Sequence, residues 1–377
     1  MRKWIALVVL ALAVAALGTL PLQAADTIKI GVIAPLTGPA AESGRYQTQG
    51  AKLAVEEINK AGGVLGRPLE LIIEDDQTTN PGGIMAFSKL AGNQDIAAFI
   101  GSVRSTQVNA MSPDVIKVGK PVMIGGTDPT LTHMDNPWYF RFRPNDSYSA
   151  RVMADYGVKT LGKRKWAIVH STDAFGTGGM KNLVAALKNM GIEPVLVQGY
   201  TNNSQDFTPV AIAVKRSGAD IMASYITFEP DLGVLARQLR QLGVNIDWIG
   251  SATNMSTTAL RLAGAAMNGT YVVADFNSES CPAAKAYAAS YEAAYKMRPD
   301  HFSAWAYDAV HVLALAMNKA KSTDPAKVRQ AILSIKDYKG AEGTYNFDKN
   351  GDGLHGYNVV KNVGGKIVFD QHIDFKD

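Results

Sequence analysis

The chain lacks paired cysteines and the residue patterns that most enzymes need. Its one cysteine, Cys281, excludes a disulfide within the chain, and we expect this thiol to be a small buried residue rather than a reactive one. No nucleophile elbow, His-Glu-x-x-His pair or phosphate-binding P-loop occurs, and the six histidines stand singly. We therefore predict that the protein is not an enzyme and has no catalytic residues, no metal and no cofactor.

Charge of one sign is also scarce. The formal net charge is +4, and removal of Arg2 and Lys3 would leave +2. No run of Lys and Arg with interleaved aromatic residues occurs, so we predict no nucleic-acid partner. Hydrophobic residues make up 47% of the chain and charged residues 19%, which is typical of a globular protein.

One segment has part of the pattern of a calcium-binding loop. Asp348, Asn350 and Asp352 have the spacing of the first three ligands of such a loop. The twelfth position, which needs a bidentate Glu, is Val359. We therefore interpret 348–353 as a polar turn between strands.

Long hydrophobic runs are missing except at the N-terminus. Arg2 and Lys3 precede an apolar run at 4–17, and small residues follow near Ala24. This run of about 14 residues is shorter than the roughly 18–20 that a membrane-spanning helix needs, which argues against a retained anchor. We predict a cleaved signal peptide at 1–24 and a mature protein in the periplasm. No cysteine near the cut offers a lipid-attachment site.

Strand-like and helix-like patterns alternate along the rest of the chain. The first set of predicted strands is 27–33, 69–73, 96–100 and 121–124, with helices at 47–60, 83–91 and 105–118. The second set has strands at 165–169, 194–197, 220–225 and 248–250, with helices at 178–190, 207–217 and 231–242. This alternation predicts an α/β fold with two Rossmann-like lobes and mostly parallel sheets.

The C-terminal third departs from this alternation. We expect long helices at 282–296 and 302–320, and a third that starts at Asp324-Pro325. Two strands at 356–369 enclose the turn at Gly364-Gly365. Because no Pro/Ser-rich linker separates the halves, we expect the chain to cross between lobes through short, structured segments. We interpret Gly176, Gly178 and Gly179 as a flexible helix entry.

Two loops that follow predicted strands favour a ligand site, because ligands of doubly wound folds bind where strands end. In the loop 101–106, Ser102 or Ser105 either caps the next helix or binds an anion at its N-terminus, and the two roles are compatible. In the loop 125–129, Thr127 offers a hydroxyl beside a free amide. Together the loops are suited to a carboxylate.

Several motifs in combination resemble one family along essentially the whole mature chain. They are 30–39 (IGVIAPLTGP), 50–51, 56–59, 61–63, 75–81, 101–106, 173–176 (DAFG) and 307–309 (YDA). The chain resembles the periplasmic leucine/isoleucine/valine-binding proteins, the type I solute-binding components of ABC importers.

This resemblance implies two lobes joined by a three-segment hinge that closes on a ligand, and a membrane permease as partner. It places lobe 1 at 25–145 plus 277–355 and lobe 2 at 146–276 plus 356–377. We expect the protein to be a monomer.

The resemblance also implies the ligand-binding residues. The serine that binds the carboxylate falls at 102–105, and we favour Ser105 over Ser102, with Thr106 beside it and Arg104 as a charged partner or a solvated side chain. The following carbonyl and hydroxyl-amide positions match Gly125 and Thr127. Aromatic positions match the following three residues, for which a plain core role stays open: Phe175, Phe228 and Phe302.

Two positions depart from the family pattern. The acid that pairs with the ligand's α-ammonium group falls at Ala252, and an aromatic residue at the lip of the site is Ser43 here. A buried ammonium group without a carboxylate costs several kcal/mol. Either another acid takes over, with Asp128, Asp173 and Glu229 as candidates, or the ligand has no α-amino group. The family's disulfide is absent too.

The sequence leaves three candidate functions to compare. The leading one is a periplasmic binding protein that captures a branched-chain or hydrophobic amino acid, or a related small carboxylate, for an ABC importer. The alternative ligand is an aromatic or aliphatic carboxylate that lacks an α-amino group. The second is a ligand sensor that docks on a signalling receptor. The third, a secreted hydrolase, lacks a nucleophile–base pair in the sequence.

Overall fold

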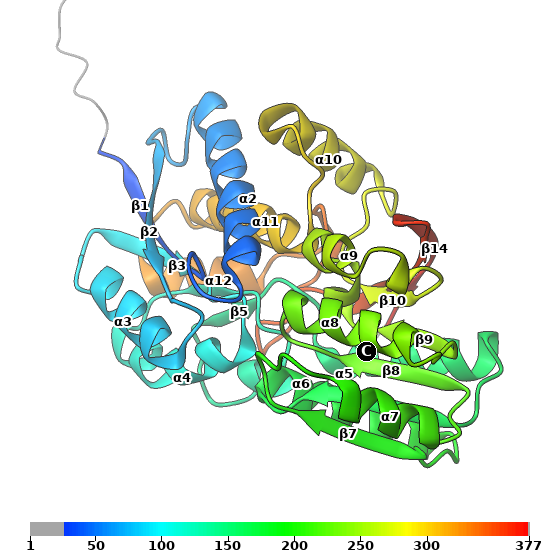
Figure 1. The fold of residues 1–377 in the computed structure, drawn as a ribbon. Coiled ribbons are helices and arrows are strands. Elements are labelled where there is room, and N and C mark those ends of the chain that lie inside the picture. Colours follow the sequence, from blue (N-terminus) through cyan, green and yellow to red (C-terminus); the bar gives the residue numbers. More distant parts are fainter. Residues whose placement is uncertain (1–25, 376–377) are drawn as a thin grey trace, which may run out of the picture.

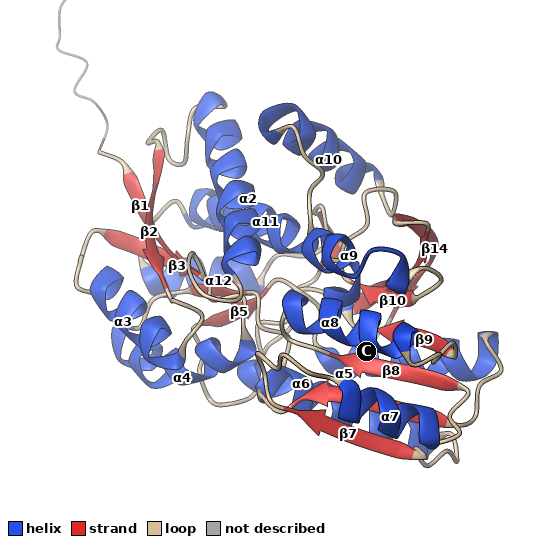
Figure 2. Ribbon diagram, viewed as in Figure 1, coloured by secondary structure: helices blue, strands red, loops and turns tan. Residues whose placement is uncertain are grey.

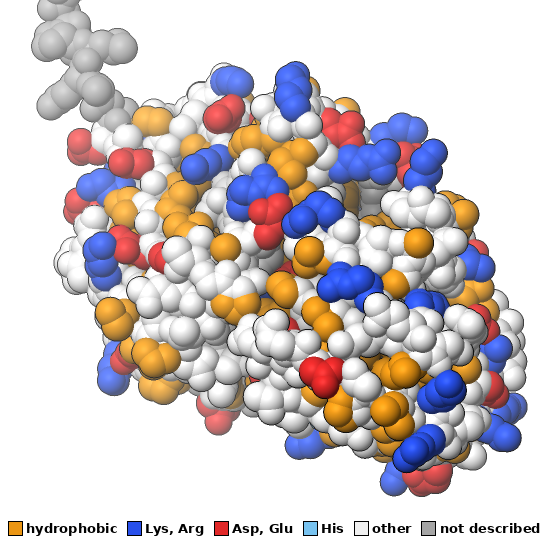
Figure 3. Space-filling view, in the orientation of Figure 1, with side chains coloured by type: hydrophobic (Ala, Val, Ile, Leu, Met, Phe, Trp, Pro, Cys, Tyr) orange, Lys and Arg blue, Asp and Glu red, His pale blue; other side chains and the backbone are white. Residues whose placement is uncertain are grey.

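The computed structural model describes residues 26–375 and contains two α/β lobes side by side (Figures 1 and 2). Each lobe is built on its own sheet, one of five strands and one of seven. The predicted signal peptide lies outside the described residues. No helix between residues 26 and 375 is both long enough and apolar enough to span a membrane. Basic and acidic side chains are interspersed over the face shown in Figure 3.

The first lobe contains the five-stranded sheet, which has the order β2-β1-β3-β4-β5 and is parallel throughout. Its strands are β1 (Ile28–Ala34), β2 (Leu69–Asp75), β3 (Ile96–Ile100), β4 (Val122–Ile124) and β5 (Tyr139–Arg141). Its helices are α2 (Ala41–Lys60), α3 (Asn80–Ala91) and α4 (Ser105–Val118). Alternate strand residues face opposite sides: Ile33 packs with α3 and α4, whereas Val32 packs with α2.

The second lobe contains the seven-stranded sheet, of order β14-β13-β10-β9-β8-β6-β7. Its strands are β6 (Trp166–Ser171), β7 (Leu196–Tyr200), β8 (Ile221–Tyr225), β9 (Asp247–Gly250), β10 (Tyr271–Ala274), β13 (Gly356–Val363) and β14 (Lys366–Asp374). Its helices are α5 (Asp146–Asp155), α6 (Ala174–Asn189), α7 (Thr208–Arg216), α8 (Glu229–Gln241) and α9 (Thr257–Ala263). Only β13 and β14 run antiparallel to their neighbours. The predicted α/β fold with mostly parallel sheets is therefore confirmed.

Three further helices belong to the first lobe, although they follow most of the second lobe along the chain. They are α10 (Pro282–Tyr295), α11 (His301–Ala320) and α12 (Pro325–Leu333), followed by the small strands β11 (Tyr338–Lys339) and β12 (Thr344–Tyr345). Helix α11 packs along α2 in the core of this lobe. Asp324 caps α12, as its sequence predicts. Cys281 is half-buried, and its sulfur accepts a hydrogen bond from the Ala284 amide in the first turn of α10. It is therefore not the buried residue that the sequence predicted.

The chain crosses between the sheets at three places, namely 142–145, 275–281 and 346–355. Arg143 in the first crossing forms an ion pair with Asp275 in the second. The side chain of Asn145 in the first donates a hydrogen bond to Asp352 in the third, at 3.2 Å. The crossings are thus short and bonded to one another.

Several elements differ from the sequence expectations. Helix α2 begins at Ala41 rather than at 47, and α6 begins at Ala174, so the three glycines lie inside this helix instead of forming a flexible entry. They allow close packing: a Cβ on Gly179 would lie 2.1 Å from the ring of Tyr225. Strand β10 and helices α5 and α9 were absent from the sequence prediction.

Candidate functional site

A cavity of about 230 Å³ lies between the two lobes. Every segment that lines it follows a strand or begins a helix, which is where parallel sheets place their ligand loops. From the first lobe it is lined by Thr78, Thr79, Asn80, Val103, Arg104, Ser105, Thr106, Gln107, Thr127, Arg143 and Phe302. From the second lobe it is lined by Asp173, Phe175, Asn202, Asn203, Thr227, Phe228 and Thr253.

The sequence-predicted residues divide into two groups. Seven line the cavity: Arg104, Ser105, Thr106, Thr127, Phe175, Phe228 and Phe302. Ser102, Gly125 and Ala252 do not. Ser102 donates its hydroxyl to the Asp76 carboxylate at 2.7 Å instead. Gly125 lies against Trp305, and its carbonyl accepts from Arg143.

The N-terminus of α4 forms one corner of the cavity. Its N-cap residue is Arg104. The capping role that the sequence suggested for Ser102 or Ser105 is therefore not observed. The Ser105 hydroxyl accepts from the amides of Thr127 and Asp128 at 3.1 and 3.2 Å. The predicted free amide of Thr127 is therefore already bonded. With its acceptor role filled, the Ser105 hydroxyl keeps its own proton for a ligand oxygen, because no residue from 26 to 375 accepts it.

Arg104 reaches across the cavity from the first lobe to the second. Its Nη1 donates to the carbonyl of Thr227, and its Nη2 donates to Ser43 at 3.0 Å and to Glu229 at 3.2 Å. The guanidinium lies over the rings of Phe228 and Phe302, at 5.4 and 5.2 Å from their centroids. Its Nε is buried and has no partner among the described residues. The Nε–H and the second N–H of Nη1 have no partner among the described residues and are left for a ligand.

A second arginine was missed by the sequence prediction. Arg143 lines the cavity from the first crossing, where Asp275 and the Gly125 carbonyl hold it. Its guanidinium also lies 5.7 Å from the centroid of Phe302. The one sequence signal for it is the alternation of Arg141 and Arg143 before Pro144 at the end of a short apolar run.

Each of the three acids suggested for an ammonium group already accepts at least one hydrogen bond. Glu229 is paired with Arg104, and Asp128 accepts from Thr130 through Oδ1. Asp173 lines the cavity, but its oxygens accept from the Gly176 amide and from Asn202 at 2.9 and 2.7 Å. The described cavity therefore contains hydrogen-bond donors for an anion, and its one lining carboxylate, Asp173, already accepts from neutral donors.

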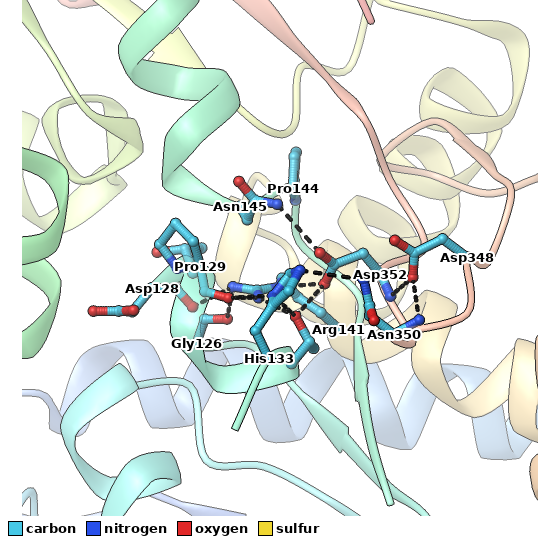
Figure 4. A network of polar contacts seen from close by, with 12 residues as sticks. Gly126, Asp128, Pro129, His133, Arg141, Pro144, Asn145, Asp348, Asn350 and Asp352 are labelled. Atoms are coloured by element: carbon cyan, nitrogen blue, oxygen red, sulfur yellow. Dashed lines mark hydrogen bonds and ion pairs between the residues drawn. The ribbon is translucent and has the colours of Figure 1, made fainter. Parts of the chain in front are cut away.

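The loop that carries Thr127 is held from behind by a buried arginine (Figure 4). Arg141 is fully buried and donates through Nε to Asp352 at 2.7 Å and through Nη1 to the Asp128 carbonyl at 2.6 Å. Asp352 belongs to the segment with the partial calcium-loop pattern. Its side-chain oxygens accept hydrogen bonds from Arg141, Asn145 and Thr132. The backbone amides of Asn350 and Asp352 donate to the side chain of Asp348, which forms the turn of this segment.

Gly178 lets the two lobes approach closely beside the cavity. A Cβ at this position of α6 would lie 2.7 Å from Oδ2 of Asp128 in the other lobe. We expect Gly178→Ala to weaken ligand binding about tenfold, because overpacking of this kind costs roughly 1–3 kcal/mol. Titration calorimetry with a bound carboxylate measures the change. The matched control is Gly92→Ala, where the nearest atom is 3.4 Å away and no effect is expected. Unchanged affinity in Gly178→Ala would show that Asp128 swings aside freely.

Comparisons with known proteins agree with this architecture. Residues 27–366 match the model of a family described as periplasmic binding protein. The chain is 33% identical to the Leu/Ile/Val-binding protein BraC3 of Rhizobium johnstonii, with 94% of this chain and 96% of that protein covered. It is 32% identical to Leu/Ile/Val-binding protein homolog 3 of Brucella melitensis biotype 1, with 90% and 93% covered. The structure is similar to a periplasmic binding protein type 1 from Bordetella pertussis Tohama I, with a TM-score of 0.84, 30% identity, and 92% and 100% covered.

Proposed function

This chain belongs to the periplasmic binding protein family, and from that membership we propose that it is the substrate-binding component of an ABC importer. It captures a small carboxylate with a hydrophobic body and delivers it to a membrane permease. The two relatives at 32% and 33% identity are named as Leu/Ile/Val-binding proteins, which supports a ligand of similar size.

The observation that carries the ligand class is the corner at the N-terminus of α4. The Ser105 hydroxyl is left with a proton to donate, and the first backbone amides of a helix attract an anion. Phe175, Phe228 and Phe302 supply apolar walls. A carboxylate in the corner and a hydrocarbon chain or ring between the aromatic residues fit this cavity.

We infer further that the ligand has no α-amino group. Ala252 is buried in a short 3-10 turn and has no charge to offer. Asp173 and Glu229 already have partners. Burying an ammonium ion without a free carboxylate costs several kcal/mol, which argues against an amino acid. The names of the relatives favour the second candidate, a branched-chain amino acid.

The mechanism we propose is closure of two lobes about the three crossings. Lobe 1 is 25–145 plus 277–355 and lobe 2 is 146–276 plus 356–377, a division supported by the sheet to which each strand belongs. Residues 1–24 direct the chain to the periplasm as a cleaved signal peptide, where it acts as a monomer. The protein binds its ligand without converting it.

A thermal-shift panel tests the ligand class. It compares leucine, isoleucine and valine with 4-methylpentanoate, 4-methyl-2-oxopentanoate and benzoate, and includes 4-methylpentanamide as an uncharged control. We expect a carboxylate without an amino group to stabilise the protein most, by about 2.7 kcal/mol at 100 times its Kd. The amide is expected to have no effect, and the bound compound is expected to be recovered unchanged.

Two results would contradict this proposal. A large shift with leucine and none with the des-amino acids would mean that a group in the cavity accepts the ammonium ion after all. Stabilisation by the amide and by no carboxylate would mean that the α4 corner does not bind an anion.

A further inference from the structure

The hydroxyl of Thr127 faces a buried carboxyl group from the opposite lobe. Thr127 lines the cavity, and its Oγ1 lies 2.8 Å from Oδ2 of Asp146 at the start of α5. The backbone amide of Asp146 donates to the Thr127 carbonyl at 2.9 Å, so the pair is held at two points. Both residues are 2% exposed. A hydroxyl has one proton, and its direction therefore depends on what Asp146 can accept.

Asp146 lies among groups that act on its proton in opposite directions. Burial raises its pKa to about 7, while the Thr127 hydroxyl and the cations Arg143 and Arg141 act to lower it and Asp128 acts to raise it. Two tyrosines from the second sheet, Tyr225 and Tyr357, also face it; their own pKa values are raised by burial and by Asp146, so they stay neutral. The Ser149 hydroxyl lies 3.4 Å from its Oδ1.

We propose that Asp146 controls the affinity of the cavity for a carboxylate by setting the direction of the Thr127 hydroxyl. When Asp146 is ionised, Thr127 donates its proton to Asp146 and presents only lone pairs to the cavity. When Asp146 is protonated, it donates to Thr127, and the Thr127 hydroxyl is free to donate to a ligand carboxylate. Asp146 is thus a positioning residue that acts through Thr127 without touching the ligand.

This inference rests on the proposed function, because it concerns how the Thr127 hydroxyl binds a ligand carboxylate. A carboxylate oxygen beside Thr127 needs a donor there, and in the ionised state it meets lone pairs with a second carboxylate behind them. Binding of the anion therefore takes up a proton at Asp146 when the pH is above its pKa. By linkage, one proton taken up weakens binding about tenfold for each pH unit above that pKa and has no effect well below it.

The test uses 4-methylpentanoate as probe and measures Kd by calorimetry from pH 6 to pH 8.5. In the wild type we expect Kd to be flat at the acidic end and to rise about tenfold between pH 7.5 and 8.5. Asp146→Asn keeps an N–H donor to Thr127 at every pH, so it is expected to bind tightly with no pH dependence. Thr127→Val is expected to bind weakly at every pH. Asp155→Asn, an exposed change on the same helix, is expected to keep the wild-type profile.

A wild-type Kd that does not vary with pH, or an Asp146→Asn variant that keeps the slope, would overturn the proposal. If Asp146→Asn does not fold, calorimetry of the wild type at pH 8 in two buffers of different ionisation enthalpy counts the protons taken up on binding. We expect nearly one proton, and an uptake of none would overturn the proposal.

If the probe fails to bind, the proposed ligand class is wrong. Carboxyl NMR of the ligand-free protein then decides: the pKa of Asp146 should rise in Thr127→Val, and an unchanged value would overturn the coupling.

Discussion

Replacing Arg104 by methionine is expected to weaken carboxylate binding about 100-fold or more while it barely changes the melting temperature of the ligand-free protein. Arg104 joins the lobes through Glu229 and the Thr227 carbonyl. The side chains of the ion pair are 8% and 2% exposed, so the variant leaves Glu229 buried without its partner. Breaking such a pair costs about 3–5 kcal/mol, and each 1.4 kcal/mol corresponds to a tenfold change in Kd.

The effect should fall on binding because the pair spans the cleft. In the proposed open form both groups contact water, and only the closed form suffers the loss. The surface variant Arg45→Met is a matched control, because its pair with Glu42 is 38% exposed on both sides and lies within one helix. Adding Glu229→Gln to Arg104→Met should restore part of the affinity, which a double-mutant cycle measures. An equal loss of melting temperature without ligand would show that the pair also forms in the empty protein.

The second large effect is expected on folding. Arg141→Lys should lower the free energy of unfolding by about 3–5 kcal/mol, because the planar guanidinium is replaced by an ammonium group that cannot reach the same acceptors. Arg141 is fully buried and binds Asp352, the Asp128 and Pro129 carbonyls, and Thr132. The change therefore loosens both the loop that carries Thr127 and the third crossing.

Urea denaturation measures this loss as a lower midpoint at constant slope. Arg67→Lys is the matched control, because Arg67 also donates to backbone carbonyls but does so at the surface, where we expect a change below about 0.5 kcal/mol. Equal stability of Arg141→Lys and the wild type would mean that water or a neighbouring side chain replaces the guanidinium contacts. A changed slope would instead indicate that the two lobes no longer unfold together.

Local pattern predicted the regular elements well and the joining elements poorly. Strand β3 and helix α4 have the bounds 96–100 and 105–118, which the apolar periodicity had indicated. Strand β10 has four residues, and its pairing partner β13 lies more than 80 residues further along the chain. Helix α5 directly follows the first crossing, and its buried face mixes apolar residues with polar ones such as Asp146 and Ser149. A short element that depends on distant partners leaves little trace in local sequence.

The same limit applies to the site. Loops at strand ends pointed to Ser105 and Thr127, because that reasoning depends on topology alone, whereas the three phenylalanines came from the family resemblance. The pairs that set the charge balance join residues far apart, with 125 positions between Arg104 and Glu229 and 132 between Arg143 and Asp275. The bond between the Ser105 hydroxyl and the Thr127 amide likewise needed the structure. Sequence reasoning therefore located the cavity without its electrostatic partners.

The order in which the chain visits the two sheets also bears on how the protein is made. Strand β10 pairs on one side with β9 and on the other with β13, which belongs to the last segment of the chain. Until that segment has been synthesised, β10 is an open edge and the second lobe is incomplete. The first lobe likewise waits for α10 to α12. The first lobe therefore cannot finish folding before α12, which ends at Leu333, has been synthesised, and the second cannot finish before β13 has been. Both lobes must complete their folding late, after most of the chain is present.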